Sequence, residues 1–136
     1  MVLTSGGTEA NNLALSGARA LVVSRLEHPS VTRSAEALAD RGVPVVWLPV
    51  SSAGRVDPDS VGRALAGLEV GATAVVTVVN HETGVVQPLD AIFDVARGAG
   101  ARLHVDAVQA VGKLAPESYS RADSIAVAAH KLRGPK

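Results

Sequence analysis

The sequence has 136 residues, which suffices for one domain or part of one. Lys and Arg number 13 and Asp and Glu also number 13, so the formal net charge is zero and gives no sign of a nucleic-acid or membrane-surface partner. No apolar run approaches the roughly 18 residues that span a bilayer, and the first residues do not resemble a signal peptide. The absence of cysteine excludes disulfides and thiolate metal sites from these residues. We therefore expect a cytoplasmic protein with no metal site.

The first predicted element is a helix that follows a glycine-rich turn. The turn reads TSGGTE over 4–9, and an apolar helical pattern follows over 10–18. Gly6 and Gly7 allow the backbone to approach a ligand, and Thr8 can cap the helix. Free N–H groups and the helix dipole would then favour an anion such as phosphate. An ordinary capped turn is the alternative interpretation, because short Gly-Thr turns are common.

Each of the next three predicted strands is followed by a predicted helix. The strands are 21–24, 43–48 and 72–79. The helices start at a proline or directly after one, are followed by glycine, and span 29–41, 58–66 and 89–97. The stretch 72–79, ATAVVTVV, is a β-branched run without alternation, which is typical of a strand buried on both faces of a sheet.

Two further apolar stretches, 102–109 and 122–128, complete the series. The first reads RLHVDAVQ, and it indicates a buried strand that ends in polar groups. Strands and helices alternate with short links, which predicts an α/β fold, doubly wound, with a mainly parallel sheet and flanking helices. A composition that is 47% hydrophobic but 2% aromatic suits the tightly packed core of such a fold.

Polar clusters follow four of the predicted strands. They are His28, Asn80 to Glu82, Asp106 to Gln109, and His130 with Lys131. The carboxyl ends of parallel strands meet at one edge of a sheet, where ligands bind. A carboxylate buried there is costly unless a cation meets it, so Asp106 calls for a positively charged partner. Each cluster alone has a plainer interpretation, such as a capping histidine or a surface lysine.

One ligand accounts for the whole set, namely pyridoxal 5′-phosphate (PLP). Its phosphate would lie on Gly7 and Thr8, and Lys131 would form a Schiff base with it. Asp106 would pair with the protonated pyridine nitrogen and so hold the ring as an electron sink. Two more side chains complete the expected contacts, to the ring hydroxyl and to the ring face: Gln109 and His28.

Five segments, in this order and spacing, carry a resemblance to a known family. They are TSGGTEANNLAL, EHPSV, VNHETGVVQP, HVDAVQAVGKL and AHKLRGPK. The chain resembles the class V aminotransferase family and, within it, the cysteine desulfurases of the NifS/IscS type. The resemblance covers essentially the whole chain. It implies that residues 1–136 are the central part of the PLP-binding large domain of a fold-type I transferase, with the family's N-terminal segment and C-terminal small domain outside them.

The resemblance also implies individual roles. Gly7 and Thr8 match the family's phosphate-binding pair. His28 matches the histidine that stacks on the cofactor ring and assists proton transfers. Asp106 and Gln109 match the groups on the pyridine nitrogen and on the ring hydroxyl.

The remaining positions include two departures from the family pattern. Lys131 matches the Schiff-base lysine, which would serve as general base for substrate protons, and His130 lies in the phosphate-side loop. The family's cofactor-binding asparagine is replaced in strict register by His81, next to Asn80. The serine three residues before the lysine is Ala128 here. At about 1.5–3 kcal/mol for a hydrogen bond to a charged group, that loss would weaken cofactor binding tenfold or more.

The implied reaction converts L-cysteine to L-alanine and passes sulfur to an enzyme persulfide. The family's catalytic cysteine lies downstream of the lysine, and a homodimer partner completes the phosphate site. We therefore expect a PLP-dependent cysteine desulfurase-type enzyme, for which these residues supply the cofactor site. We expect these residues to be inactive alone. The expected substrate is L-cysteine or a related amino acid, and the expected partner is a sulfur-acceptor protein. Another class V PLP enzyme, such as a selenocysteine lyase, and a non-catalytic PLP-binding remnant or interaction module remain open. A Rossmann-like nucleotide binder is disfavoured, because no G-x-G-x-x-G follows the first strand.

Overall fold

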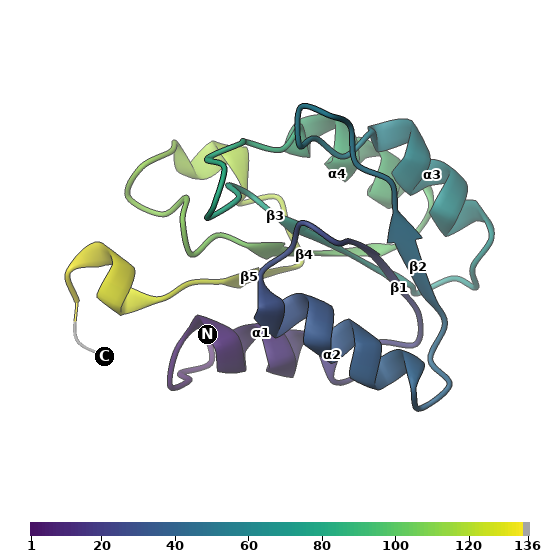
Figure 1. Cartoon of the computed structure of the whole chain (residues 1–136), viewed down its shortest axis with the longest axis horizontal. Helices are drawn as coiled ribbons and strands as arrows, with labels where there is room; N and C mark the ends of the chain where they lie inside the picture. Colours follow the sequence, from purple (N-terminus) through teal and green to yellow (C-terminus); the bar gives the residue numbers. More distant parts are fainter. Residues whose placement is uncertain (135–136) are drawn as a thin grey trace.

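The computed structural model describes residues 1–134, so Pro135 and Lys136, the end of the GPK motif, lie outside the described residues. Helices and strands alternate along the chain (Figure 1). The α-helices are α1 (Gly7–Leu15), α2 (Pro29–Ala39), α3 (Pro58–Ala66) and α4 (Leu89–Gly98). The strands are β1 (Leu21–Ser24), β2 (Val45–Leu48), β3 (Thr73–Thr77), β4 (Arg102–Asp106) and β5 (Ser124–Ala126). Two short 3-10 helices follow β4 and β5, at Pro116–Ser118 and Ala129–Leu132.

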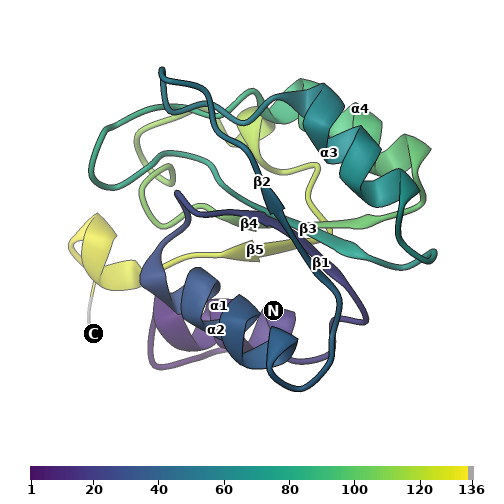
Figure 2. The same cartoon turned by 45° about the vertical axis from the view of Figure 1, so that its right-hand side comes forward.

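The five strands form one parallel sheet in the order β2-β1-β3-β4-β5. Helices α1 and α2 cover one face of this sheet, and α3 and α4 cover the other (Figures 1 and 2). The doubly wound, parallel α/β fold predicted from the alternation of strands and helices is confirmed. No helix among residues 1–134 combines the length and apolar character that crossing a membrane requires.

The core consists of two apolar layers, one on each face of the sheet. Val76, Ile92 and Phe93 belong to the layer under α3 and α4, and Leu21 and Val31 to the layer under α1 and α2. The central strand β3 is buried along its whole length, as the β-branched run at 72–79 predicts. Burial of apolar surface at about 25 cal/mol per Å² drives the formation of both layers.

The start of the first helix differs from the expectation. Helix α1 begins at Gly7, with Gly6 at the cap position, and no side chain caps it. The expected capping by Thr8 is therefore wrong, because Thr8 lies inside the first turn. Gly6 has a φ of 154°, which residues with a side chain rarely adopt, so the turn needs glycine at this position.

Several other elements are shorter than the apolar patterns predict. β2 begins at Val45, because Pro44 has no N–H to contribute to the ladder. β3 ends at Thr77, beyond which the chain forms an isolated antiparallel bridge between Val79 and Val86. β5 spans only Ser124–Ala126 of the apolar run 122–128. The strands are nevertheless all parallel to their neighbours, in agreement with the predicted, mainly parallel sheet.

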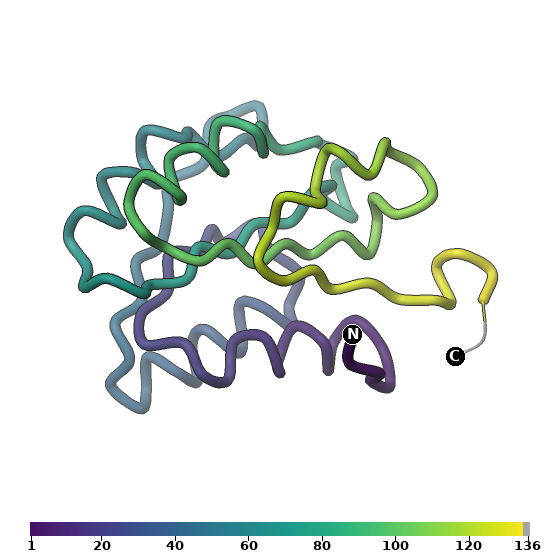
Figure 3. Tube along the Cα trace, turned by 180° about the vertical axis from the view of Figure 1, so that it is seen from behind, coloured from purple at the N-terminus to yellow at the C-terminus, as the bar shows by residue number. Residues whose placement is uncertain are grey.

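The topology brings distant segments of the chain to the carboxyl edge of the sheet. Figure 3 shows the turn before α1 close to the segment that leaves β5. A Cβ placed on Gly7 would lie 3.7 Å from the Cβ of Ala128, so the two segments are in direct contact. β3 and β4 end together, because Thr77 is paired with Asp106 in the register of the two strands.

Candidate active site

A cavity of about 250 Å³ opens at this edge, between the start of α1 and the segment after β5. Of the residues that the sequence singles out as a site, all but one line it: Gly7, Thr8, His28, His81, Asp106, Gln109, His130 and Lys131. They come from five separate stretches of the chain. The convergence expected from the parallel topology is therefore present in the structure.

Asn80 is the exception, and its side chain is used within its own loop. Its Oδ1 accepts hydrogen bonds from the N–H groups of Glu82 and Thr83 and from the Thr83 hydroxyl, at 2.9–3.0 Å. Its Nδ2 donates to the carbonyl of Leu26 at 2.8 Å. Asn80 is buried and does not line the cavity. The geometry thus gives Asn80 a role in folding the loop, and only His81 of this pair reaches the cavity.

Asp106 is the buried carboxylate of the site. It ends β4 and is 5% exposed. Its Oδ1 accepts the N–H of Val108 at 3.0 Å, and its Oδ2 accepts from Nδ2 of Asn11 at 2.7 Å. Within residues 1–134, no lysine, arginine or histidine forms an ion pair with it. The cation that this carboxylate calls for is therefore not supplied by the described residues, and Asp106 lines the cavity from which one can reach it.

The start of α1 forms another wall of the cavity. The first N–H groups of a helix have no acceptor within the helix, and here no side chain caps them. A Cβ on Gly7 would lie 2.8 Å from Cγ2 of Val108, so no larger residue fits without displacement. Ala128 also lines this wall and offers no hydroxyl. Backbone N–H groups at a close-packed helix start suit an anion.

His28 has two functions in the structure. It caps α2, because its Nδ1 accepts the N–H of Ser30 at 3.1 Å, and it also lines the cavity. Its ring lies 5.2 Å from that of His81, centroid to centroid, in an edge-on arrangement at 61°. The capping interpretation of His28 is therefore confirmed, and its ring also lies in the cavity wall, where the site interpretation requires it.

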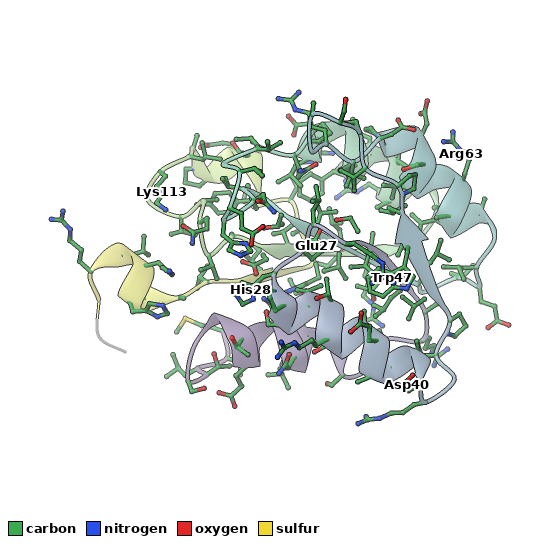
Figure 4. All side chains as sticks on the ribbon, viewed as in Figure 1. Glu27, His28, Asp40, Trp47, Arg63 and Lys113 are labelled. Atoms are coloured by element: carbon green, nitrogen blue, oxygen red, sulfur yellow. The ribbon has the colours of Figure 1, made fainter. Side chains whose placement is uncertain are left out.

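Glu27 is a second buried carboxylate near the site, and no role was predicted for it. Figure 4 shows it close to the strands, with His28 at the start of α2. Its Oε2 accepts the N–H of Thr77 at 2.6 Å, and its Oε1 accepts from the hydroxyl of Ser24 at 2.8 Å. β1 ends at Ser24 while β3 continues, so this carboxyl group replaces a missing strand neighbour. Burial raises the pKa of Glu27 to about 8, and the nearby charge of Asp106 adds to that effect.

Gln109, His130 and Lys131 lie on the more open side of the cavity. Gln109 is half-buried, and its Oε1 accepts from Nζ of Lys113 at 2.8 Å. His130 and Lys131 belong to the short 3-10 helix after β5, and both are exposed. The cavity thus has a buried carboxylate, a helix start and an exposed amine on different sides.

Sequence reasoning missed Asn11, which is 1% exposed and lines the cavity. It lies within a predicted helix beside the identical residue Asn12. Helical spacing could have distinguished them, because Asn11 follows Gly7 by four residues and Thr8 by three and so shares their face. Four other lining residues were also missed: Thr77, Val79, Val108 and Ala128, the last of which was noted only as a departure from the family pattern.

Comparison with known proteins gives a consistent result. The family model described as "Aminotransferase class-V" matches residues 1–136. A cysteine desulfurase of Bradyrhizobium diazoefficiens is 40% identical over 146 residues, which cover all of this chain and 36% of that protein. DndA of Streptomyces lividans superimposes with a TM-score of 0.87 at 34% identity, over 99% of this chain and 40% of the other. A structure of SspA in complex with cysteine superimposes with a TM-score of 0.87 at 29% identity, over 98% of this chain and 40% of the other. The chain spans about a third of the length of the curated relatives.

Proposed function

Because this chain belongs to the aminotransferase class-V family, we propose that it forms the PLP site of a cysteine desulfurase-type enzyme. The observation that carries the proposal is Asp106, a buried carboxylate without a cationic partner among the described residues, in the wall of a cavity. A protonated pyridine nitrogen supplies the missing cation. A Rossmann-type dinucleotide remains disfavoured, because no G-x-G-x-x-G follows the first strand.

Other residues of the cavity suit the phosphate of PLP and the carbon at which PLP is bound covalently. The uncapped start of α1 at Gly7 and Thr8 matches the phosphate, which needs N–H donors and close approach of the backbone. Lys131 provides the primary amine that binds PLP covalently. When bound, PLP supplies an electron sink for bonds at the α-carbon of an amino acid.

The side chains of the cavity then have separate tasks. Asp106 keeps the ring nitrogen protonated, and Gln109 presents its amide to the ring hydroxyl. Nδ1 of His28 accepts the N–H of Ser30, so in the neutral ring the hydrogen is on Nε2. Nε2 is therefore the nitrogen that is available for proton transfer. Lys131 moves protons at its Nζ once it is free of the cofactor. We assign no cofactor contact to Asn80.

The substrate proposed is L-cysteine or a related amino acid. Relatives at about 40% identity are named cysteine desulfurase, and the similar SspA structure contains cysteine. Formation of a persulfide needs a thiol, and these 136 residues contain no cysteine, so that thiol has to come from outside them. We propose that the enzyme acts as a homodimer and transfers sulfur to an acceptor protein. We also propose that these residues alone do not release sulfide or alanine from L-cysteine.

The test is covalent capture of PLP by the purified chain. We expect a visible absorption band on adding PLP, fixation of the cofactor by borohydride, and a mass increase on the tryptic peptide that holds Lys131. Lys131→Ala should abolish the fixation, whereas the matched variant Lys113→Ala, at a lysine that does not line the cavity, should retain it. Absence of the band in the unaltered chain, or labelling that persists in Lys131→Ala, would overturn the proposal.

A non-catalytic PLP-binding module is the second candidate. Ala128 favours it, because a methyl group lines the wall where a hydroxyl would bond the phosphate. Ala128→Ser adds that hydroxyl at a site that is 4% exposed. A tenfold or larger gain in PLP affinity in this variant, without sulfide release when a thiol-bearing partner segment is supplied, would favour the module over the enzyme.

A further inference from the structure

A line of hydrogen bonds runs behind Asp106 from the surface into the core. The hydroxyl of Ser124 lies 2.8 Å from Nδ1 of His104, whose Nε2 lies 3.0 Å from Oδ1 of Asn11. Nδ2 of Asn11 lies 2.7 Å from Oδ2 of Asp106. Asn11 and His104 are each 1% exposed. No residue of this line except Asp106 has a role in the proposed function so far.

The chemistry of the groups fixes the direction of every bond in the line. An ionised carboxylate only accepts, so the Asn11 amide must present Nδ2 to Asp106 and Oδ1 to His104. Oδ1 also only accepts, so the hydrogen of the imidazole is on Nε2. Burial lowers the pKa of His104, so the ring is neutral and carries one N–H. Its Nδ1 therefore accepts from the Ser124 hydroxyl, and all three bonds donate toward Asp106.

The Asn11 amide also has a second branch, toward His28. Its other Nδ2 hydrogen is directed to Oγ of Ser30 at 2.9 Å. Oγ of Ser30 lies 2.8 Å from Nδ1 of His28, which already accepts the backbone N–H of Ser30. The serine hydroxyl therefore donates to Nδ1. One asparagine thus uses both hydrogens and its oxygen to connect three groups, and two of these branches end on side chains of the cavity.

We propose that Asn11 is a positioning residue that orients Asp106 and His28 toward a PLP ring, and that His104 sets the direction of its amide. This inference rests on the proposed function and adds two residues to it. Bonds that all donate in one direction polarise one another and concentrate donor strength at the last acceptor. The result is a carboxylate held in one rotamer and an imidazole held with its hydrogen on Nε2.

The first test compares Asn11→Ala with the matched variant Asn12→Ala. Asn12 is the same residue type one position later, exposed and outside the cavity. Loss of a hydrogen bond to a buried charge should weaken PLP binding by about 10- to 100-fold in Asn11→Ala, with little change in Asn12→Ala. The pH midpoint of the visible band of bound PLP should also move by about one pH unit, which corresponds to a tenfold change. Thermal melting without PLP reports whether each variant folds.

The second test examines His104 without any cofactor. In the 15N-labelled chain, the imidazole shifts at pH 7 to 8 should show the Nε2–H form, and Asn11→Ala should disturb that form. His104→Gln retains an N–H donor at the outer end of the side chain and should bind PLP like the unaltered chain. His104→Leu loses the donor and should bind as weakly as Asn11→Ala.

The outcomes separate this inference from the function on which it rests. If the chain binds PLP and Asn11→Ala matches Asn12→Ala in affinity and in spectrum, the inference is overturned and the function stands. If no variant binds PLP, the function is overturned and the cofactor-free spectra decide the network. The inference is then refuted if His104 has the Nδ1–H form, or if Asn11→Ala leaves its form unchanged. It is supported if His104 has the Nε2–H form and Asn11→Ala loses that form.

Discussion

Replacing Glu27 with glutamine is expected to remove a large pH dependence of folding stability. The glutamine amide has the same shape as the carboxyl group. Its oxygen can accept the N–H of Thr77, and its NH₂ can donate to the hydroxyl of Ser24. The variant therefore keeps both hydrogen bonds and loses only the ability to become charged. Any change in stability then reports the cost of ionising this buried group.

The size of the effect follows from the raised pKa. A rise from 4.5 to about 8 corresponds to about 5 kcal/mol, at about 1.4 kcal/mol per pKa unit. Between these two values the folded chain binds more protons than the unfolded chain, so the free energy of unfolding falls as pH rises. The contribution of the protonated Glu27 to the free energy of unfolding is fully present below pH 4.5 and is lost by the time the pH passes 8. The lowered pKa of His104 acts in the opposite direction, but only below about pH 6.5, where its imidazole begins to bind protons in the unfolded chain.

The assay is urea unfolding of the unaltered chain and of Glu27→Gln at half-unit steps between pH 6.5 and 9. Over this window the unaltered chain should lose up to about 1.4 kcal/mol per pH unit until it levels off, and Glu27→Gln should be nearly flat. The control is Glu69→Gln, at an exposed position, which should follow the unaltered chain. An unaltered chain that gains stability with rising pH, or a Glu27→Gln variant that keeps the slope, would refute the reasoning.

Two other substitutions test the packing of the helix starts. Gly7→Ala should weaken PLP binding measured by absorbance titration, because the new Cβ would lie 2.8 Å from Cγ2 of Val108, while Gly17→Ala, which meets nothing within 4 Å, should bind normally. Asp57→Ala removes the side chain that accepts two N–H groups in the first turn of α3 and should cost about 1 kcal/mol in urea unfolding. PLP affinity in Asp57→Ala should stay unchanged, because Asp57 does not line the cavity, and a loss of affinity would contradict this expectation.

The fold was predictable because its signals are local and repeat along the chain. Helix α3 was predicted with its observed bounds, since Asp57 and Pro58 mark its start and Gly67 its end. β1 was equally well bounded. The ends of β3 and β5 were not, because apolar residues continue past the last ladder bond in both, and pairing between strands decides where a ladder stops. No local pattern records that pairing.

The site was predictable in its residue types but not in its connections. Polar residues after predicted strands led to Asp106, His28 and Lys131, and all three line the cavity, since the topology takes the strand ends to one edge. The same rule could not identify Asn11, because this residue lies on a helix and reaches the sheet edge through its position on one face of that helix. Asn80 was expected at the cofactor and instead holds its own loop, because a polar loop has to satisfy its backbone before its side chains are free for a ligand.

The two buried carboxylates at this edge differ in whether a cation can reach them. Glu27 and Asp106 each accept two hydrogen bonds from neutral donors. Glu27 is enclosed by protein, so ionisation has no compensation there and the carboxyl group keeps its proton up to about pH 8. Asp106 lines a cavity through which a cation can reach it. A protonated Glu27 leaves one negative charge at the sheet edge instead of two, and a single charge is what a singly protonated ring nitrogen can balance.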